Sequence, residues 1–350
     1  MYPINHNYKM PPEWTKHTRT FISWPIQASM CYPEDYDAVC QGYAEIIQAI
    51  AEFEPVTVIV NPADLERISR LFHNKWIEFL PIKHNDAWLR DNGPTFLVRD
   101  DGDVVGVNWR FNAWGGKYAP WDLDDLVATE ILNHVGLKRF DAPLVMEGGS
   151  LHVDGEGTLL TTEECLLNPN RNPEMTREQI EAELKKFLNI QKVVWLKKGL
   201  DGDETDGHVD NIACFAAPGK ILLLVCVDPE DENYGITQDN LKILKRETDA
   251  QGRGFQIIPI QQPPKLCDPV TKARLTLSYL NFYFVNEGII LPVFGGDAKE
   301  SDKLAAQVLS KTFPERRIRT VNGMGIIREG GNVHCTTLQM PARRDLCEKR

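Results

Sequence analysis

The stretch GHVDNIACFAAPGKILLLVCV, Gly207 to Val227, has an outline that recurs along the chain. A polar segment that contains glycine leads into a first apolar run, Pro218-Gly219 interrupts it, and a second apolar run follows. Short apolar runs joined by a tight turn are typical of β-hairpins. We therefore predict a hairpin here, with polar residues at its entry.

Four other segments share this outline. Turns are predicted at Asp100 to Asp103, Asp154 to Gly157 and Asn286 to Gly288, and the last segment, GGNVHCTTLQMP, is cut short by the C-terminus. Helical periodicity separates the hairpins. It occurs at Asp35–Phe53, Leu123–Val135, Arg177–Leu188, Gln238–Thr248 and Lys299–Leu309. Short β-rich pieces follow four of these helices, at 56–60, 193–196, 255–260 and 317–321.

The predicted unit is therefore a β-hairpin, a helix and a strand, repeated about every 60 residues. We call the polar segments that lead into the hairpins the polar leaders. They lie near Asp91, Glu147, His208, Asn281 and Asn332. One such unit cannot bury both a helix face and a sheet face, whereas a closed ring of five would. We predict a single catalytic α/β domain, residues 1–350, with the leaders gathered near the axis of the ring. An ordinary α/β sandwich with coincidental spacing stays open.

The composition of the chain argues against several classes of function. The chain has 350 residues, of which 42% are hydrophobic, and a net charge of −11, which argues against a nucleic-acid surface. No apolar run is long enough for a membrane span, and the N-terminus lacks a signal-peptide pattern. Eight scattered cysteines without a CxxC pair argue against a zinc ribbon and favour a reducing cytoplasm.

Cys335 is the candidate nucleophile, because it follows a Gly-Gly-Asn loop at the expected start of a hairpin. A thiol needs a base or a lowered pKa to react, and a His with a carboxylate behind it meets that need. His208 and Glu147, in other leaders, would supply that pair. A buried structural thiol is the alternative, since most cysteines are buried.

Asp91 and Asp210 are two carboxylates among the leaders, and on a strand Asp210 would share a face with His208. Paired acids can perform glycosidase or aspartic-protease chemistry, or clamp a guanidinium. They can also form plain salt bridges, for which Arg90 is the neighbouring cation. Trp88 could stack on a bound cation. One His and one Asp are too few ligands for a metal, so no metal site is expected.

Two near-copies, MEGGSLHV at 146–153 and REGGNVHC at 328–335, contain glycine pairs. They lack the lysine and spacing of nucleotide-binding loops. The glycines are expected to allow positive φ, which lets the backbone approach the axis. The two histidines of these loops, His152 and His334, are interpreted as structural.

Taken together, motifs spread from Trp24 to Met340 resemble agmatine deiminase, a guanidino-group-modifying family with the pentein fold, a five-bladed α/β propeller. The motifs are WPxxxxxxYPEDY, WLRDNGP, NWRFNAWGGK, EGGS, LLNPNRNP, GHVDN and GGNVHC. The resemblance implies that Cys335 is the nucleophile and His208 the general acid and base. It implies that Glu147 orients His208, and that Asp91 and Asp210 hold the guanidinium.

The resemblance also places Trp88 in the substrate cavity and Glu204 near the distal amine of the substrate. It implies a hydrolase acting on C–N bonds of linear amidines, which converts agmatine to N-carbamoylputrescine and ammonia in putrescine biosynthesis. No cofactor is implied, and family members tend to form homo-oligomers. The roles of Asp206 and Glu329 stay unassigned.

Other activities stay open at this point. Peptidyl-arginine and free-arginine deiminases use the same chemistry, although the acidic stretch GDETD, 202–206, suits a distal ammonium better than an α-carboxylate. A Cys-His protease would need an oxyanion hole, and two carboxylates at the reacting carbon would oppose its oxyanion. A non-catalytic repeat scaffold is the remaining alternative.

Overall fold

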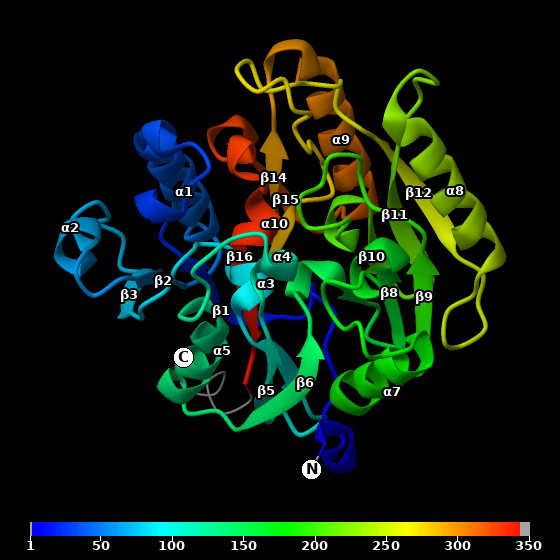
Figure 1. Cartoon of the computed structure of the whole chain (residues 1–350), viewed down its shortest axis with the longest axis horizontal. Helices are drawn as coiled ribbons and strands as arrows, with labels where there is room; N and C mark the ends of the chain where they lie inside the picture. The colour runs from blue at the N-terminus through cyan, green and yellow to red at the C-terminus, as the bar shows by residue number, and fades with distance from the viewer. Residues whose placement is uncertain (1, 344–350) are drawn as a thin grey trace.

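The structure, a computed structural model, describes residues 2–343. Five small β-sheets surround a common centre, and helices lie on the outer side of the ring (Figure 1). This is the predicted five-bladed pseudo-symmetric α/β propeller. The strands are β1 His17–Ser23, β2 Val56–Val60, β3 Ile77–Pro81, β4 Thr95–Val98, β5 Val104–Arg110, β6 Arg139–Val145, β7 His152–Val153, β8 Thr158–Thr162, β9 Lys192–Leu196, β10 Ala213–Ala217, β11 Lys220–Val225, β12 Gln256–Gln261, β13 Tyr283–Val285, β14 Gly288–Val293, β15 Arg317–Asn322 and β16 Thr337–Pro341.

Each blade repeats one connection. In the blade that contains the opening stretch, β10 and β11 form an antiparallel hairpin, and β12 then pairs with β11 in parallel. Parallel neighbours need a crossover connection, and a long helix supplies it. The five long helices are α1 Tyr36–Ile50, α5 Asp124–His134, α7 Arg177–Leu188, α8 Glu232–Arg246 and α9 Lys299–Thr312. Four of the five predicted hairpins form, and the five predicted helices follow in the expected order.

Two kinds of element depart from the prediction. Helix α8 begins at Glu232 rather than Gln238, because the side chain of Asp231 accepts the N–H of Asn233 and caps the helix there. Strands β1, β3 and β6 were not predicted. Their sequences mix polar residues or proline into the run, so their pairing partners, rather than their own pattern, make them strands.

The fifth blade differs most from its expected form. The final segment does not form a truncated hairpin of its own, since β16 pairs antiparallel with β1, and Phe21 lies opposite Leu338. The two ends of the described chain therefore close the ring, and β1 becomes an inner strand between β16 and β2, with β16 at the edge of the sheet. Cys335 lies in the short helix α10, Val333–Thr336, directly before β16, and not at the start of a hairpin.

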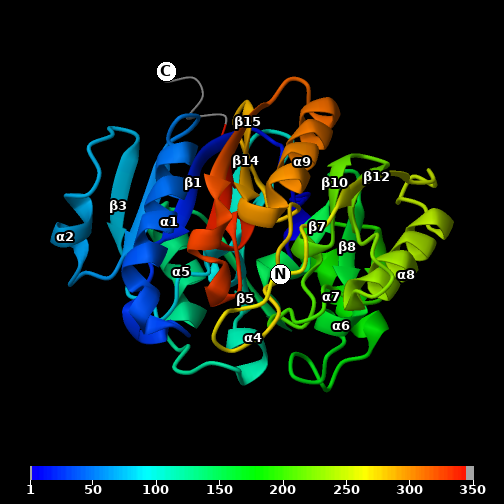
Figure 2. The ribbon, with the colours of Figure 1, turned by 90° about the horizontal axis from the view of Figure 1, so that it is seen from above.

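The hydrophobic core lies between each sheet and the helices beside it. Helix α1 buries Tyr43, Ile46 and Ile50 against strand β2 and against Ile290 of the neighbouring blade, so packing ties adjacent blades together. Figure 2 shows the same molecule turned by 90°, with the short helix α4, Ala113–Gly116, at one end.

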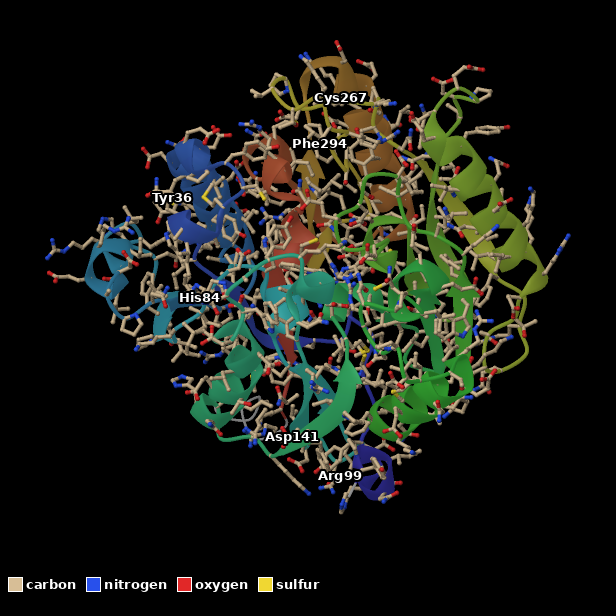
Figure 3. The ribbon with its side chains drawn as sticks, in the orientation of Figure 1. Tyr36, His84, Arg99, Asp141, Cys267 and Phe294 are labelled. Carbon is tan, nitrogen blue, oxygen red and sulfur yellow. The ribbon has the colours of Figure 1, made fainter. Side chains whose placement is uncertain are left out.

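Polar and exposed side chains occupy the outside. Asp141 and Cys267 are both exposed and lie at opposite outer edges of the ring (Figure 3). The cysteines at positions up to 335 are unpaired thiols, and Cys347 lies outside the described residues. Among the helices of residues 2–343, none combines the length and apolarity that crossing a membrane requires.

Candidate active site

The predicted polar leaders meet near the centre of the ring. The short elements that carry them are in mutual contact, and α3 and α10 lie there in Figure 1. They are α3 Leu89–Asn92, η4 Gly148–Ser150, η5 Val209–Asn211 and α10. The leader of the fourth unit joins them through Asn281, whose side chain contacts Asn211, Asp210 and Cys335. The gathering predicted from the repeats is confirmed.

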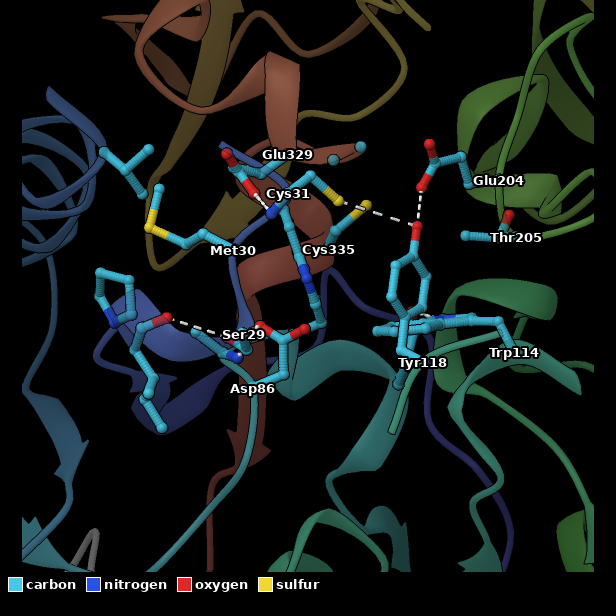
Figure 4. A pocket seen from close by; sticks show the side chains of 18 of the residues that line it. Ser29, Met30, Cys31, Asp86, Trp114, Tyr118, Glu204, Thr205, Glu329 and Cys335 are labelled. Carbon is cyan, nitrogen blue, oxygen red and sulfur yellow. Dashed lines mark hydrogen bonds between the residues drawn. The ribbon is translucent and has the colours of Figure 1, made fainter. Parts of the chain in front are cut away.

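A cavity opens beside this cluster (Figure 4). Its empty space, counted to and including the open mouth, is about 670 Å³. Four of the candidate residues line it, namely Cys335, Asp91, Trp88 and Glu204. The other three, His208, Asp210 and Glu147, are not part of the cavity wall but are buried behind it.

The side chain of Cys335 lies beside Asp210 of η5 and beside Asn281. Its Sγ is 3.6 Å from Oδ2 of Asp210 and 3.1 Å from Nδ2 of Asn281. Burial, followed by the nearby charges of Asp210 and Asp91, raises the pKa of the thiol well above its ordinary value. With the cavity empty, the sulfur is therefore a thiol at neutral pH.

The two candidate carboxylates are held by different partners. Asp91 accepts the indole N–H of Trp114 and the backbone N–H of Gly149, both at 2.9 Å. Asp210 is 2.9 Å from Nδ1 of His334 through Oδ2. Burial raises the pKa of Asp91. Burial acts on Asp210 in the same direction, but the facing His334 outweighs it and holds the pKa of Asp210 below its usual value.

Arg90 does not form the salt bridge that the sequence left open. Its guanidinium is 3.3 Å from Glu13 and from the carbonyl oxygen of His334, at Nη1 and Nε respectively. Asp91 therefore has no arginine or lysine partner among the described contacts, and the basic group that faces it is His208, whose Nδ1 is 3.8 Å from Oδ1.

His208 lies between two carboxylates. Nε2 is 3.7 Å from Oε2 of Glu147, and Nδ1 is 3.8 Å from Oδ1 of Asp91. Burial lowers the pKa of His208, but Asp91, Cys165 and Glu147 outweigh it and raise the pKa well above the ordinary value. The surrounding groups therefore favour the protonated form of the imidazole.

The sequence predicted a strand for His208 and Asp210, but in the structure neither residue lies on one. His208 precedes η5 and Asp210 lies within it. Both side chains nevertheless approach Gly149: a Cβ built on that glycine would be 2.6 Å from Nδ1 of His208 and 2.9 Å from Oδ2 of Asp210. The side chains converge because a tight turn, rather than a pleated strand, carries them.

The glycine pair of the first EGG loop has another role than the expected one. Neither Gly148 nor Gly149 has a positive φ, whereas Gly330 of the second loop does, at 98°. A Cβ on Gly148 would lie 2.1 Å from the carbonyl oxygen of Arg90. Glycine is therefore required in the first loop because neighbouring atoms lie too close for a Cβ. The expected positive φ is confirmed only in the second loop, at Gly330.

The sequence reasoning missed four residues of the site: Arg171, Trp114, Asn281 and Glu13. Arg171 donates from Nε to Glu147 at 2.7 Å and from Nη1 to Asp206 at 2.7 Å. Asp206, whose role was unassigned, thus anchors the arginine behind Glu147. Asn281 could have been identified from the sequence, because it occupies the polar-leader position of its unit. Nothing local in the sequence marks Glu13.

Glu147, Cys165 and His208 each offer a possible metal ligand, with the three atoms within 4.8 Å of one another. Glu147, however, already pairs with the Arg171 guanidinium. Burial alone would raise the pKa of Glu147, but His208 and Arg171 hold it below its usual value. A second cation beside Arg171 would meet electrostatic repulsion, so this trio is a poor metal site.

Acidic side chains surround the outer part of the cavity. Glu204 bonds to the hydroxyl of Tyr118, and Glu329 accepts the backbone N–H groups of Cys31 and Tyr32 (Figure 4). This gives Glu329 a role that the sequence left open, since it holds the 31–32 loop at the cavity. Burial raises the pKa of Asp86, also in the wall, to about 7.

Comparison with known proteins shows similarity over nearly the whole chain. Residues 9–341 match the Porphyromonas-type peptidyl-arginine deiminase family. Agmatine deiminase of Pseudomonas syringae pv. tomato is 43% identical over 365 residues, with 97% of both chains covered.

Solved structures extend the similarity to the fold. Agmatine deiminase of Enterococcus faecalis superposes with a TM-score of 0.92 at 35% identity, covering 98% of both chains. The C. jejuni agmatine deiminase with substrate bound has a TM-score of 0.86 at 30% identity, covering 96% of this chain and 97% of that one. An amidinotransferase from Microseira wollei, 13% identical with a TM-score of 0.55, shares the fold alone. The chain therefore belongs to the Porphyromonas-type peptidyl-arginine deiminase family and, within it, to the agmatine deiminases of the pentein fold.

Proposed function

We propose that this chain hydrolyses agmatine to N-carbamoylputrescine and ammonia through a covalent thiouronium on Cys335. The observation that carries the proposal is the placement of one cavity-lining thiol beside two buried carboxylates. Sγ of Cys335 is 3.6 Å from Asp210, and Asp91 lines the same cavity. A guanidinium between these groups would present its central carbon to the sulfur.

The carboxylates would hold the substrate in place. A guanidinium carries N–H donors in a rigid plane that matches carboxylate oxygens. Oδ1 of Asp210 has no hydrogen-bond partner among the described residues although it is buried, and Asp91 faces the same cavity. Fixing the substrate this way turns a bimolecular attack into one between aligned neighbours.

The substrate would also activate the thiol. The pKa of Cys335 is raised partly by the negative charges of Asp210 and Asp91. A bound cation compensates these charges and so lowers the pKa of Cys335. The thiolate is then formed in the presence of the substrate, which limits side reactions of the empty enzyme.

Proton transfer would fall to His208. The thiolate attacks the guanidinium carbon, and cationic His208 gives a proton to the nitrogen that leaves as ammonia. The resulting thiouronium is attacked by water, from which neutral His208 removes a proton, and the C–S bond then breaks to release the ureido product. Glu147, 3.7 Å from the ring and backed by Arg171, would orient the imidazole and stabilise its charge.

The cavity wall supports selection of agmatine over arginine. Asp86, Asp91, Glu204 and Glu329 line it, and no lysine or arginine is among the lining residues of the described chain. Arg328 points away, toward Asp35 and Asp268. The α-carboxylate of arginine would lack a cation here and would meet these acids. The distal ammonium of agmatine would instead be stabilised, with Glu204 as its proposed partner.

A substrate panel tests the proposal. Purified protein is given agmatine, free arginine, a peptidyl-arginine mimic and methylated arginines, and both ammonia and ureido products are measured. We expect kcat/KM for agmatine to exceed that for the other compounds by at least about 100-fold, the cost of an unpaired buried charge. Comparable turnover of arginine would refute the substrate, and no ammonia from any compound would refute the chemistry.

The unpaired cysteines support a cytoplasmic location. The family resemblance supports a role in putrescine synthesis and assembly as a homo-oligomer. Sedimentation equilibrium of the purified chain tests the assembly, and a monomer at micromolar concentration would contradict it.

A further inference from the structure

A buried chain of charged groups lies behind Asp210, on the side away from the cavity. His334 bridges two carboxylates, with Nδ1 2.9 Å from Oδ2 of Asp210 and Nε2 2.8 Å from Oε1 of Glu13. Arg90 is 3.3 Å from the same Glu13 oxygen. His334, Glu13 and Asp210 are each at most 4% exposed, so solvent does not screen these contacts.

The bridge leaves one oxygen of Asp210 available. Oδ2 is occupied by His334, whereas Oδ1 has no partner among the described residues. Nδ2 of Asn281 also donates to Oδ2, at the longer distance of 3.4 Å. The contact with His334, at 2.9 Å, is the shorter of the two and involves a charged ring, so it is the stronger restraint on the carboxylate.

The charge of His334 fits this role. Burial lowers its pKa and Arg90 acts in the same direction, but Glu13 and Asp210 outweigh both and raise it. Burial works against ionised Glu13, yet His334 and Arg90 hold its pKa well below the usual value. The group is thus an alternating series of two cations and two anions, Arg90, Glu13, His334 and Asp210, in which each buried charge has an opposite partner.

We propose that His334, anchored by Glu13, is a positioning residue that turns Asp210 so that its free oxygen faces the guanidinium. This inference rests on the proposed function, because it concerns the group that would hold the substrate. It differs from the structural role expected from the sequence. Glu13 precedes β1 in the chain, so the N-terminal segment would contribute to substrate binding from behind the site.

Two variants of the same residue separate positioning from packing. His334→Asn places an amide nitrogen where Nδ1 lies, so it retains a donor to Asp210 and gives up the contact with Glu13. His334→Gln places its amide nitrogen near Nε2, so it retains the contact with Glu13 and loses the donor to Asp210. Both keep the backbone bonds of His334 to Asn281 and Arg90, which hold Cys335 in place.

We expect His334→Gln to raise KM for agmatine by about 10- to 100-fold, the loss of one hydrogen bond to a charged group, with kcat changed by less than about fivefold. His334→Asn should keep KM within about fivefold of the unchanged protein. Thermal unfolding is measured for both, since a purely structural role would lower the unfolding temperature without separating the two KM values. Equal KM values, the reverse order, or the failure of His334→Asn to fold would overturn the proposal.

A binding measurement keeps this inference distinct from the proposed function. The affinity for guanidinium chloride, measured by isothermal titration calorimetry, should be similar in the unchanged protein and in His334→Asn, and about 10-fold or more weaker in His334→Gln. If the unchanged protein hydrolyses no guanidino compound, the proposed function fails while this comparison still decides the role of His334. Equal affinities of the two variants would overturn that role even in an active deiminase.

Discussion

A Cβ atom built on Gly149 would lie 2.6 Å from Nδ1 of His208. Real Cβ atoms do not approach a ring nitrogen so closely, so the imidazole occupies space that only glycine leaves open at position 149. The same glycine donates its backbone N–H to Asp91 at 2.9 Å. Gly149 therefore shapes the site without contributing a reactive side chain.

Replacing Gly149 by alanine should displace the imidazole and reduce kcat/KM for agmatine by about 100-fold or more, since a 1 Å misplacement costs that much. Steady-state kinetics measures the effect. The matched control is Gly235→Ala in α8, where an added Cβ meets nothing within 4 Å. That change should leave kcat/KM unchanged and stabilise the fold by about 0.5–1 kcal/mol. Near-normal activity of the Gly149 variant would contradict the geometry.

Cys335→Ser should abolish turnover, because a serine hydroxyl in this site has neither the nucleophilicity nor the acidity of the thiol. The fold should persist, since the side chain is of similar size. Ammonia release and circular dichroism measure the two properties. Cys267→Ser, at the exposed outer edge of the ring (Figure 3), is the control with unchanged turnover. Retention of most activity by Cys335→Ser would exclude it as the nucleophile.

The alkylation of Cys335 in the empty protein should be slow at neutral pH and accelerate only at strongly alkaline pH, because burial, Asp210 and Asp91 raise the pKa of the thiol well above its ordinary value. Only the thiolate reacts, and a raised pKa moves its formation to higher pH. A haloacetamidine, whose cation can pair with the carboxylates, should react much faster near pH 7 than neutral iodoacetamide. Mass spectrometry follows both reagents, and equal rates for them at neutral pH would contradict charge compensation.

Trp114→Phe removes the indole N–H that bonds to Asp91 at 2.9 Å. A buried carboxylate then loses a donor, which costs about 1–3 kcal/mol, so kcat/KM should fall by about 10- to 100-fold. Trp109→Phe is the matched control, because its N–H bonds at 2.8 Å to Thr95 in the core. It should lower the unfolding temperature and leave kcat/KM unchanged. Similar kinetics for the two variants would count against the role of Trp114.

Glu204→Gln should raise KM for agmatine by about 10-fold, because the proposed charge partner of the distal ammonium is lost. The same variant should bind butylguanidine, which has no distal amine, as the unchanged protein does. Kinetics with both compounds measures the difference. Glu315→Gln, at an exposed carboxylate that pairs with Arg316, is the control. An equal effect of Glu204→Gln on both compounds would place Glu204 elsewhere in the mechanism.

Local sequence patterns determined most of the fold. Apolar runs separated by Pro218-Gly219 and similar turns predicted the hairpins, because turn geometry and side-chain alternation act over a few residues. Their repetition predicted the ring and the meeting of the polar leaders. The resemblance of seven motifs predicted the family, which the comparisons confirmed.

Only the tertiary structure decided which groups hold the leaders in place. The pairing of β16 with β1 joins residues at opposite ends of the described chain, and no local pattern encodes that partnership. Arg171, Asn281 and Glu13 act through contacts with residues far away in the sequence. A buried charge takes the partner that the fold brings within hydrogen-bond distance, so spacing along the chain carries no record of it.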